Sequence, residues 1–477
     1  MARQIRSTAR LQKNLTPAEE EFEAREDHRS YLSSQGQLPD GFKTSVGSFG
    51  FNPVELPTLS TTMAMTLIVP DEPTDSFAAM FTSNAIAGHP VHVGRDILAD
   101  SSAKLGGIVI NNKISNVGAP GGKEHALTVT AAVARELGLE SGVYVLPSST
   151  GVIGWQIPSG KMVDAVPSLV DGLKAGSFMP AAEGIMTTDL YPKLRAAAVE
   201  GTEARIVGIA KGAGMVEPNL ATMLVYILTD ADVPREHLDE DLRMAVGTTF
   251  NCLSIDQDQS TSDTVVAVSS RKHPCEGPAA RDAFRAAMLE VCGRLAMDVV
   301  RNGEGIQHVI QVAVRRAPTR QLAVDVGRSI VNSPLFKTAV AGNDPNVGRL
   351  LMAVGKAVGP HADTPDEFRT GTRLADAMTA SVGGTAVFEN GRFALSSEKE
   401  QLLKQHFLDA QMWSESGVHC IAMHRRARSN PCRFPVKPPY CGLALYPSLP
   451  NPPPRCGPPW PVSPAICPSL TTYCHAC

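Results

Sequence analysis

The sequence lacks the features that mark membrane proteins and nucleic-acid-binding proteins. No apolar run approaches the roughly 18 residues of a membrane span. The net charge is −4 and no tract is rich in Lys or Arg, so there is no basic surplus to bind nucleic acid. The hydrophobic content of 43% and the charged content of 19% are typical of a globular enzyme. At 477 residues the chain is long enough for two or three domains, each with its own core.

Acidic residues are absent from the C-terminal end of the chain. No Asp or Glu occurs between Val418 and Cys477, where Pro is the commonest residue. Because this composition cannot build a core, we predict a polyproline-like or disordered tail over residues 406–477. The abrupt loss of acids also suggests a translated intron or a shifted reading frame, which transcript sequencing would reveal.

The cysteines follow the same division. Three of the ten, Cys252, Cys275 and Cys292, are spread through the body, and the others crowd the tail. Isolated thiols of this kind are typical of a reduced intracellular enzyme, in which they pack in the core. The group formed by His475 and its neighbouring cysteines lacks CxxC pairs on both sides, so the tail does not predict a zinc site.

Acids are also missing from the first residues, MARQIRSTARLQKNL, which contain Arg3, Arg6, Arg10 and Lys13. This pattern resembles a mitochondrial transit peptide and lacks the apolar region of a secretory signal. A solvated basic N-terminus explains it equally well. We therefore expect residues 1–38 to be a leader or a poorly ordered arm. The expected location is the mitochondrial matrix or, without import, the cytoplasm.

The body of the chain, from about residue 40 to 405, alternates strand-like and helix-like segments. Short β-rich runs punctuated by Gly and Pro predict a mixed α/β fold rather than a helical bundle. The predicted strands are MAMTLIV, KLGGIVI, GVYVLP, EARIVGIAKGAGM, ATMLVYILTDADV, DTVVAVSS and QHVIQVAVRRA. The predicted helices are EHALTVTAAVARELG, ARDAFRAAMLEVCGRLAMDVVRNG and TRQLAVDVGRSIVNSPLFKTAVAG.

One stretch places a hydroxyl directly before an apolar run. In KGAGMVEPNLATMLVYILTDA, residues 211–231, the pair Ala221 and Thr222 precedes a predicted buried strand. On spacing alone, a plain loop that leads into this strand is the simpler interpretation. If the bond between the two residues were cut, Thr222 would carry its hydroxyl beside a free α-amine with a pKa of about 8, which could act as its base. The Gly and Pro residues before the pair allow the unusual backbone of a strained bond.

A second stretch could supply the hydrogen-bond donors that an acyl-transfer reaction needs for its oxyanion. PSSTGVIGW, residues 147–155, follows a predicted strand and offers the Thr150 hydroxyl beside the unobstructed backbone N–H of Gly151. Taken alone, the same residues describe an ordinary turn.

Together these stretches resemble the ornithine acetyltransferases, also called the glutamate N-acetyltransferases of the arginine pathway. The motifs that agree in order, over about residues 40–395, are SSTGVIG, AAEGIMTTD, KGAGMVEPNLATML, SIDQDQSTSDT, NGEG and VNSPLFKTAVAGNDPNVGR. The resemblance implies the mixed α/β fold of that family and a precursor that cuts itself between Ala221 and Thr222. The products would be an alpha subunit, 39–221, and a beta subunit, 222–405, which remain together as a heterodimer or heterotetramer.

The resemblance also implies a ping-pong reaction. Thr222 takes the acetyl group from N-acetylornithine, releases ornithine and passes the group to glutamate. Thr150 and Gly151 correspond to the oxyanion hole of the family. Some members also accept acetyl-CoA, and no metal or tightly held cofactor is implied.

Three further positions match substrate contacts of the family: Thr188 in IMTTD, Lys211 in KGAG and Glu304 in NGEG. A lysine suits the carboxylate of the substrate, and a glutamate suits the charged amine of ornithine. Without the family context, a solvated Lys211 and a helix-terminal Glu304 would be the better interpretations.

Asp256, Asp258 and Asp263 lie close together in the sequence and could suggest a metal site. We expect hydrogen bonding in a turn before the DTVVAV strand instead, because the family uses no metal there.

The chain departs from the family in three places. Asn111 matches, but the loop after it, INNKISNVGAPGG, differs from the usual Asn-rich pattern, and Val347 stands where Trp is usual. The C-terminal segment whose Asn and Thr complete the family's substrate site has no counterpart in the tail. Self-cleavage could survive this loss while turnover suffers.

Several interpretations therefore stay open. The chain is an ornithine acetyltransferase with a misread last exon, a diverged paralogue with another acyl substrate, or an inactive relative kept as a partner. A related aminopeptidase chemistry also uses a self-released nucleophile, usually Ser, and Thr222 argues against it.

Overall fold

The structure is a computed structural model of the chain. It describes residues 25–217, 223–317, 319–359 and 378–410 and four short strands between residues 414 and 475. The chain divides into two compact units, one of residues Glu26–Glu304 and the other of Met1–Arg25 with Gly305–Cys477. Each helix of the described ranges is too short or too polar to cross a lipid bilayer.

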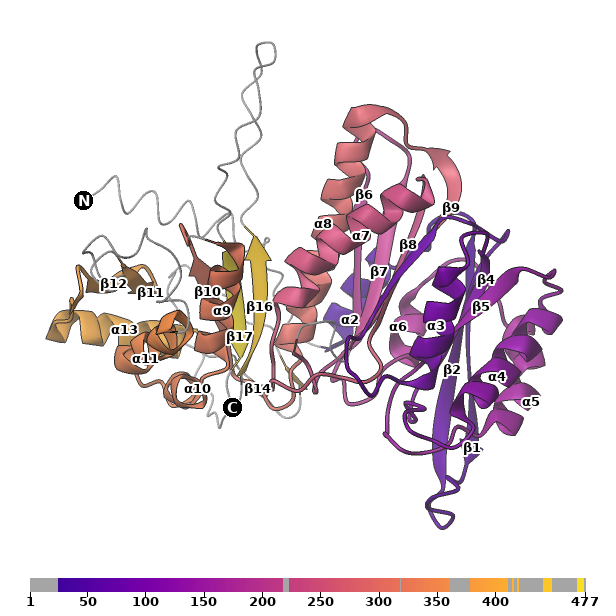
Figure 1. The fold of residues 1–477 in the computed structure, drawn as a ribbon, viewed down its shortest axis with the longest axis horizontal. Helices are drawn as coiled ribbons and strands as arrows, with labels where there is room; N and C mark the ends of the chain where they lie inside the picture. Colours follow the sequence, from indigo (N-terminus) through magenta and orange to yellow (C-terminus); the bar gives the residue numbers. More distant parts are fainter. Residues whose placement is uncertain are drawn as a thin grey trace. The chain divides into compact units, whose positions relative to one another are not determined.

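Two β-sheets form the centre of the unit Glu26–Glu304 (Figure 1). The first sheet has the order β1 (Phe42–Phe51), β2 (Thr61–Pro70), β4 (Lys104–Asn111) and β5 (Val143–Ser149). The second has the order β3 (Phe77–Phe81), β9 (Thr264–Pro274), β8 (Leu224–Asp232), β7 (Arg205–Lys211) and β6 (Lys193–Ala198). The pairs β4/β5 and β8/β9 are parallel, and the other pairs are antiparallel.

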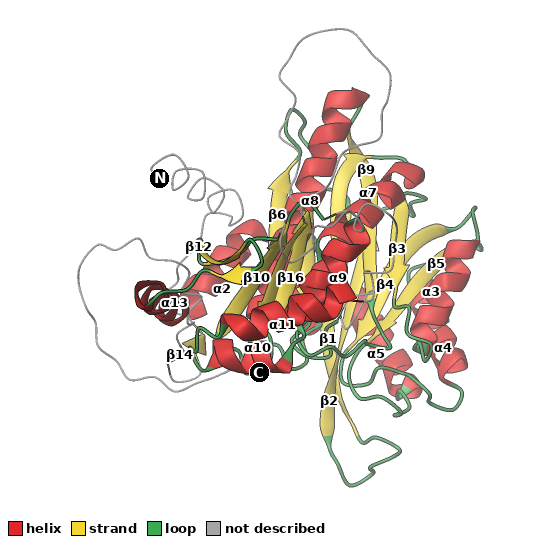
Figure 2. Cartoon of the chain, turned by 60° about the vertical axis from the view of Figure 1, so that its left-hand side comes forward, coloured by secondary structure: helices red, strands yellow, loops and turns green. Residues whose placement is uncertain are grey.

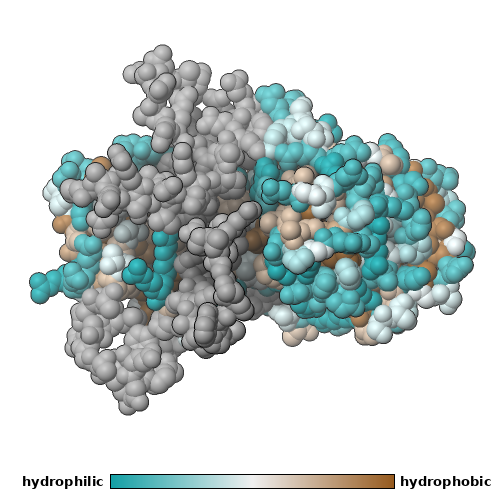
Figure 3. Space-filling view, turned by 90° about the horizontal axis from the view of Figure 1, so that it is seen from above, coloured by the Kyte–Doolittle hydropathy of each residue, from teal (hydrophilic) through white to brown (hydrophobic). Residues whose placement is uncertain are grey.

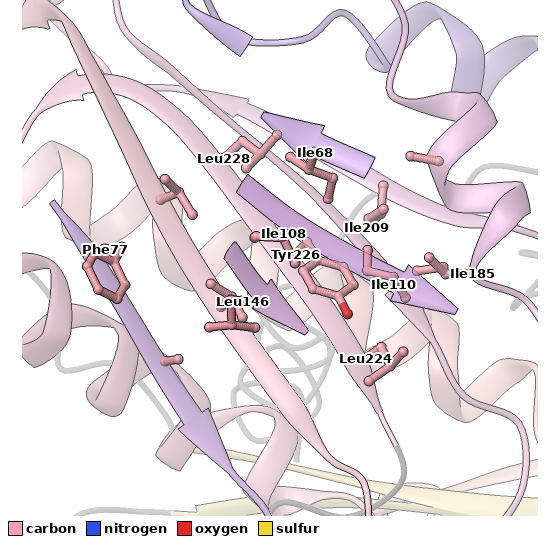
Figure 4. Close-up of a cluster of buried hydrophobic side chains, with 14 of the residues drawn as sticks. Ile68, Phe77, Ile108, Ile110, Leu146, Ile185, Ile209, Leu224, Tyr226 and Leu228 are labelled. Atoms are coloured by element: carbon pink, nitrogen blue, oxygen red, sulfur yellow. The ribbon is translucent and has the colours of Figure 1, made fainter. Parts of the chain in front are cut away.

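The main hydrophobic core lies between the two sheets (Figure 4). Strand β8 contributes Leu224, Tyr226 and Leu228, which alternate along the strand and meet Ile108 and Leu146 of the first sheet. The residues between them on β8 are also buried. An unbroken apolar run is what a strand covered on both faces requires, and the sequence-based prediction of a buried strand after residue 222 is confirmed.

Helices cover the outer face of each sheet (Figures 1 and 2). The helices α4 (Gly122–Glu136) and α5 (Ser159–Asp171) pack on the first sheet, and α7 (Arg235–Thr248) and α8 (Gly277–Arg301) pack on the second. Gly208 of β7 lies under α8, where an added Cβ would approach Cδ1 of Leu295 to 2.8 Å. The remaining helices of this unit are α2 (Arg25–Gln35), α3 (His89–Ala99), α6 (Met179–Gly184) and the short 3₁₀ helix η1 (Phe250–Cys252).

The other unit contains a set of helices and short strands. Its helices are α9 (Arg320–Val331), α10 (Pro334–Ala341), α11 (Val347–Val358) and α13 (Ser397–Asp409). Its strands before residue 440 are β10 (His308–Val314), β11 (Ala380–Val382), β12 (Thr385–Glu389), β13 (Arg392–Phe393), β14 (Ser414–Glu415) and β15 (Val418–His419). Val347, at the position where the family usually has Trp, is buried and packs with Val387 and Leu403.

Four segments of the predicted tail form strands, namely β14, β15, β16 (Cys441–Pro447) and β17 (Leu470–His475). β16 pairs with β10 in parallel, and β17 pairs with both in antiparallel directions. The prediction of a tail without regular structure is wrong for these four segments. Composition did not reveal them because strand pairing depends on main-chain donors and acceptors, which every residue except Pro provides in full.

The predicted strands and helices of the body are otherwise found, with one difference. The segment TRQLAVDVGRSIVNSPLFKTAVAG, predicted as one helix, forms α9 and α10. The hydroxyl of Ser333 accepts a hydrogen bond from the N–H of Phe336, and Pro334 is the first residue of α10. A capping Ser followed by Pro is the usual start of a helix, so the sequence itself predicts a break between the two helices.

The surface shown in Figure 3 is mostly hydrophilic over the described residues.

A buried ion pair joins α8 to the second sheet. Nε of Arg195 on β6 lies 2.6 Å from Oδ2 of Asp298 on α8, and Nη2 lies 2.8 Å from Oδ1. Both side chains are at most 5% exposed. Each oxygen of the Asp298 carboxylate accepts one hydrogen bond, so the pair has the bidentate geometry of a strong Arg–carboxylate contact.

We predict that Asp298→Asn destabilises the protein by about 3–5 kcal/mol, because it leaves the Arg195 guanidinium buried without its counter-charge. Denaturant unfolding of the purified variant measures the change. Glu290→Gln is the matched control, since Glu290 lies on the same helix, is 55% exposed and pairs with Arg294 four residues away. It should cost less than about 0.5 kcal/mol, and equal losses in the two variants would contradict the prediction.

Candidate active site

The turn after β5 presents the two predicted oxyanion donors. The N–H of Thr150 donates to the carbonyl of Asn111 at 3.0 Å, so the turn begins against the end of β4. Gly151 has φ of +130°, and an added Cβ would lie 2.1 Å from the carbonyl carbon of Lys113, so only glycine fits. Within residues 25–217 and 223–317, the Gly151 N–H and the Thr150 hydroxyl make no hydrogen bond, which leaves both free to bind an oxyanion.

Two asparagines at the end of β4 hold this turn in place. Oδ1 of Asn111 accepts from the hydroxyl of Ser149 at 2.6 Å, and its Nδ2 donates to the carbonyl of Ile114 at 2.8 Å. Asn112 donates from Nδ2 to the carbonyl of Met186 at 3.2 Å. Asn112 therefore connects the Thr150 turn to the loop that carries Thr188.

The ammonium group of Lys193 joins that loop to α8. Nζ lies 2.5 Å from Oδ1 of Asp189 and 2.6 Å from Oδ1 of Asn302, and the Lys193 side chain is fully buried. Oδ1 of Asp189 also accepts from the N–H of Gly212 at 2.8 Å. The ammonium group of Lys193 thus connects three residues that are sequence neighbours of the predicted substrate contacts. These neighbours are Asp189 beside Thr188, Gly212 beside Lys211, and Asn302 two residues before Glu304.

The predicted substrate contacts differ in exposure. Thr188 and Glu304 are exposed, whereas Lys211 is buried at the end of β7. The Glu304 carboxylate lies against Gly214, whose added Cβ would be 2.9 Å from Oε1, and the Glu304 N–H donates to Ala213 at 2.9 Å. The structure therefore places the carboxylate of Glu304 beside the turn that follows Lys211.

Charge and burial oppose each other at this turn. Burial lowers the pKa of Lys211, and the carboxylates of Asp189, Asp263 and Glu304 act in the opposite direction. Burial alone would raise the pKa of Asp189, but the ammonium groups of Lys193 and Lys211 hold it below its usual range. An anionic group that reached Lys211 would act in the same direction as the nearby carboxylates and would favour the charged form of Lys211.

The proposed nucleophile and the residue before it, Thr222 and Ala221, lie outside the described residues. Met223 is described, and its N–H donates to Oδ1 of Asp263 at 2.6 Å. Leu224 pairs with Lys211 across β7 and β8. Thr222 thus precedes Leu224, the residue that lies opposite Lys211, by two positions in the sequence.

Asp256, Asp258 and Asp263 do not form a cluster of their own. The carboxylate of Asp256 accepts from the N–H of Met215, Val216 and Asp258, so the expected hydrogen bonding in a turn is found. The group of the described residues that could hold a metal ion is Asp40, Asp230 and His273. Asp230 and His273 lie at the far ends of β8 and β9, about 20 Å along the strand from Leu224.

The predicted site residues that the structure describes lie in the turn after β5, in the loop before β6, at the end of β7 and just after α8. Sequence reasoning missed Lys193, Asp189 and Asn302. The spacing of these residues in the sequence could have predicted the contact. Lys193 and Arg195 are two residues apart on a strand, and Asp298 and Asn302 are four residues apart along a helix. Both spacings are about 6 Å, so two cations on a strand can meet two acceptors on a helix.

The chain is similar to known proteins of one family. The ArgJ family profile matches residues 57–415. The arginine biosynthesis bifunctional protein ArgJ of Rhodococcoides fascians is 38% identical over 319 residues, which cover 66% of this chain and 76% of that protein. The mitochondrial protein of the same name from Chaetomium globosum is 36% identical over 341 residues, 69% of this chain and 71% of that protein. A crystal structure of the Bacillus halodurans protein covers 40% of this chain and 96% of its own, with 25% identity and a TM-score of 0.32.

The match to the family profile and these relatives define an acyltransferase of arginine biosynthesis. The chain belongs to the ArgJ family. The sequence-based identification of the family and of the enzyme class is therefore confirmed. The match ends at residue 415, which is the last acidic residue in the sequence.

The burial of Asp263 predicts a pH-dependent effect of Asp263→Asn. Burial raises the pKa of Asp263 well above its usual range, against the opposing effects of the Met223 N–H and the Lys211 charge. Between the unfolded pKa of about 3.9 and the raised folded pKa, only the folded state holds this proton, so wild-type stability falls as pH rises through that window. Because Asn does not titrate, the variant's Tm relative to wild type should increase from pH 5 to pH 8.

Thermal melts at both pH values measure this difference. Asp258→Asn, which changes an exposed residue of the same segment, should show no such trend. A constant Tm difference between Asp263→Asn and wild type across the range would contradict the raised pKa.

Proposed function

We propose that this chain is a self-cleaving acetyltransferase that transfers an acetyl group from N-acetylornithine to glutamate through an acetyl ester on Thr222. The observation that carries the proposal is the register of β7 and β8, in which Lys211 lies opposite Leu224. It brings the buried cation of the predicted substrate site within two residues of the proposed nucleophile. Its support is the family membership together with the free donors at Thr150 and Gly151.

Self-cleavage would begin with attack of the Thr222 hydroxyl oxygen on the Ala221 carbonyl carbon. The peptide C–N bond breaks, its nitrogen takes up the hydroxyl proton, and an ester forms. Water then hydrolyses the ester, which gives Ala221 a carboxylate and frees the hydroxyl and α-amine of Thr222. The alpha and beta subunits would remain together, as a heterodimer or as a heterotetramer of two such pairs.

In the transfer reaction, the α-amine of Thr222 would accept the hydroxyl proton as the oxygen attacks the acetyl carbon of N-acetylornithine. The amide bond breaks, ornithine leaves with the proton, and the acetyl ester remains. The amine of glutamate then attacks the ester and restores the hydroxyl. Thr150 and Gly151 would stabilise the oxyanion of both tetrahedral intermediates, and no step needs a metal or an organic cofactor.

The charges beside Lys211 fit these substrates. Lys211 would bind the α-carboxylate that ornithine and glutamate share, and Glu304 would bind the side-chain amine of ornithine. Thr188 would complete the contact from its loop. Acetyl-CoA would be an additional acetyl donor, in line with the word bifunctional in the names of the relatives.

We propose the mitochondrial matrix as the location of the protein, with the cytoplasm as the alternative. The basic N-terminal residues and the mitochondrial name of the Chaetomium globosum relative support this location.

Mass spectrometry of the purified protein tests the self-cleavage. The wild type should give two chains, the second beginning at Thr222, while Thr222→Ala should remain a single chain of up to 50.7 kDa. Thr222→Ser keeps a hydroxyl nucleophile and should still be cut. An intact wild-type chain, or a cut at another bond, would overturn the proposed mechanism.

We predict that Glu304→Gln raises the KM for N-acetylornithine by about 10- to 100-fold, because a charge-assisted hydrogen bond is worth about 1.5–3 kcal/mol. Glu304 is exposed, so folding and self-cleavage should be unaffected. Steady-state kinetics measure KM, and the fraction of cut chain on a denaturing gel reports folding. Glu200→Gln, an exposed control in the same unit, should change neither quantity. An unchanged KM in Glu304→Gln would remove this residue from the proposed substrate site.

A further inference from the structure

One segment, residues 254–263, contacts the chain on both sides of residues 218–222. On the upstream side the N–H of Ile255 donates to the carbonyl of Val216 at 2.6 Å, and the hydroxyl of Ser254 donates to Oε2 of Glu217 at 2.8 Å. On the downstream side Asp263 binds the N–H of Met223. The segment therefore bonds to the described residues directly before and directly after residues 218–222.

Asp256 fixes the upstream side with both of its carboxylate oxygens. Oδ2 accepts from the N–H of Met215 at 2.5 Å, and Oδ1 accepts from the N–H of Val216 at 2.8 Å. Met215 has φ of +57°, a left-handed conformation that a side chain such as Met disfavours. Such a conformation persists only where its surroundings enforce it, and the Asp256 carboxylate supplies that constraint.

Asp263 fixes the downstream side with one oxygen. Its Oδ1 lies 2.6 Å from the N of Met223, and the N–H of Thr264 donates to the carbonyl of Met223 at 3.0 Å. The Asp263 side chain is buried, and Oδ2 has no hydrogen-bond partner in the described ranges. A buried carboxyl with one bonded oxygen is best accommodated in the neutral form, and burial indeed raises its pKa well above the usual range.

We propose that Asp256 and Asp263 are positioning residues for self-cleavage, which hold Met215, Val216 and Met223 so that the backbone enters and leaves residues 218–222 at fixed points. This inference rests on the proposed cut between Ala221 and Thr222. Attack of a hydroxyl on the adjacent carbonyl needs a near-attack arrangement, and a displacement of about 1 Å can slow such a step by about 100-fold. Neither aspartate takes part in the bond changes.

The two aspartates should respond differently to replacement by Asn. The amide of Asp263→Asn still offers one oxygen to Met223 and carries no charge, so cleavage should proceed within about threefold of the wild-type rate. Asp256→Asn keeps only one acceptor atom for Met215 and Val216, so cleavage should slow by about tenfold. The alanine variants, which lose every acceptor, should both slow by about tenfold or more.

The experiment is a pulse of cell-free synthesis of the full chain, followed by the decay of the uncut band on a denaturing gel. Asp258→Ala is the matched control, because Asp258 is an exposed aspartate of the same segment, and it should cut at the wild-type rate. Thermal melts of each purified product report stability separately. A slow Asp256→Asn beside a fast Asp263→Asn, at similar Tm, supports positioning over a general loss of stability.

Two outcomes would overturn the proposal, and they are distinguishable. If the wild-type chain stays intact at Ala221, the self-cleavage itself fails and this inference fails with it. If the wild type is cut while both alanine variants are cut at its rate, only the role of the aspartates is lost. A slow Asp263→Asn would also contradict the inference, because it would require the carboxylate charge instead of a backbone acceptor.

Discussion

The contact on which the rest of the site depends is the buried ammonium group of Lys193. It bonds to Asp189 and to Asn302, and through them it fixes the loop of Thr188, the turn after Lys211 and the segment of Glu304. A fully buried cation is costly unless its donors are used, and here the acceptors come from a loop and from the end of a long helix. The three elements therefore cannot move independently without leaving a charge unpaired in the core.

Charge balance at the site follows from this arrangement. Lys193 and Lys211 hold the pKa of Asp189 below its usual range, whereas burial raises the pKa of Asp263 well above its usual range against the opposing charge of Lys211. The pKa values of these two buried carboxyl groups are thus displaced in opposite directions. The difference comes from their neighbours and not from their burial, which is nearly complete for both.

How much of this could be read from the sequence depends on the kind of contact. The apolar run that became β8 and the motif that carries Lys211 were both predictable, because local pattern and family resemblance determine them. Strand β1 was not, since its sequence FKTSVGSFGF contains two glycines, which are depleted in strands. Lys193 was missed because a lysine at the start of a strand is usually solvated, and only the pairing of β6 with α8 reveals its acceptors.

The position of β8 in the second sheet has a consequence for how the gene can be organised. β8 lies between β7 and β9 and is hydrogen-bonded to both, so a chain cut just before it would leave one product with β7 and the other with β8 and β9. Two separately translated pieces would have to insert a central strand into a sheet that is already covered on both faces. A single reading frame that folds first and is cut afterwards avoids this assembly step, so splitting the frame into two genes at this point should carry a heavy cost in yield.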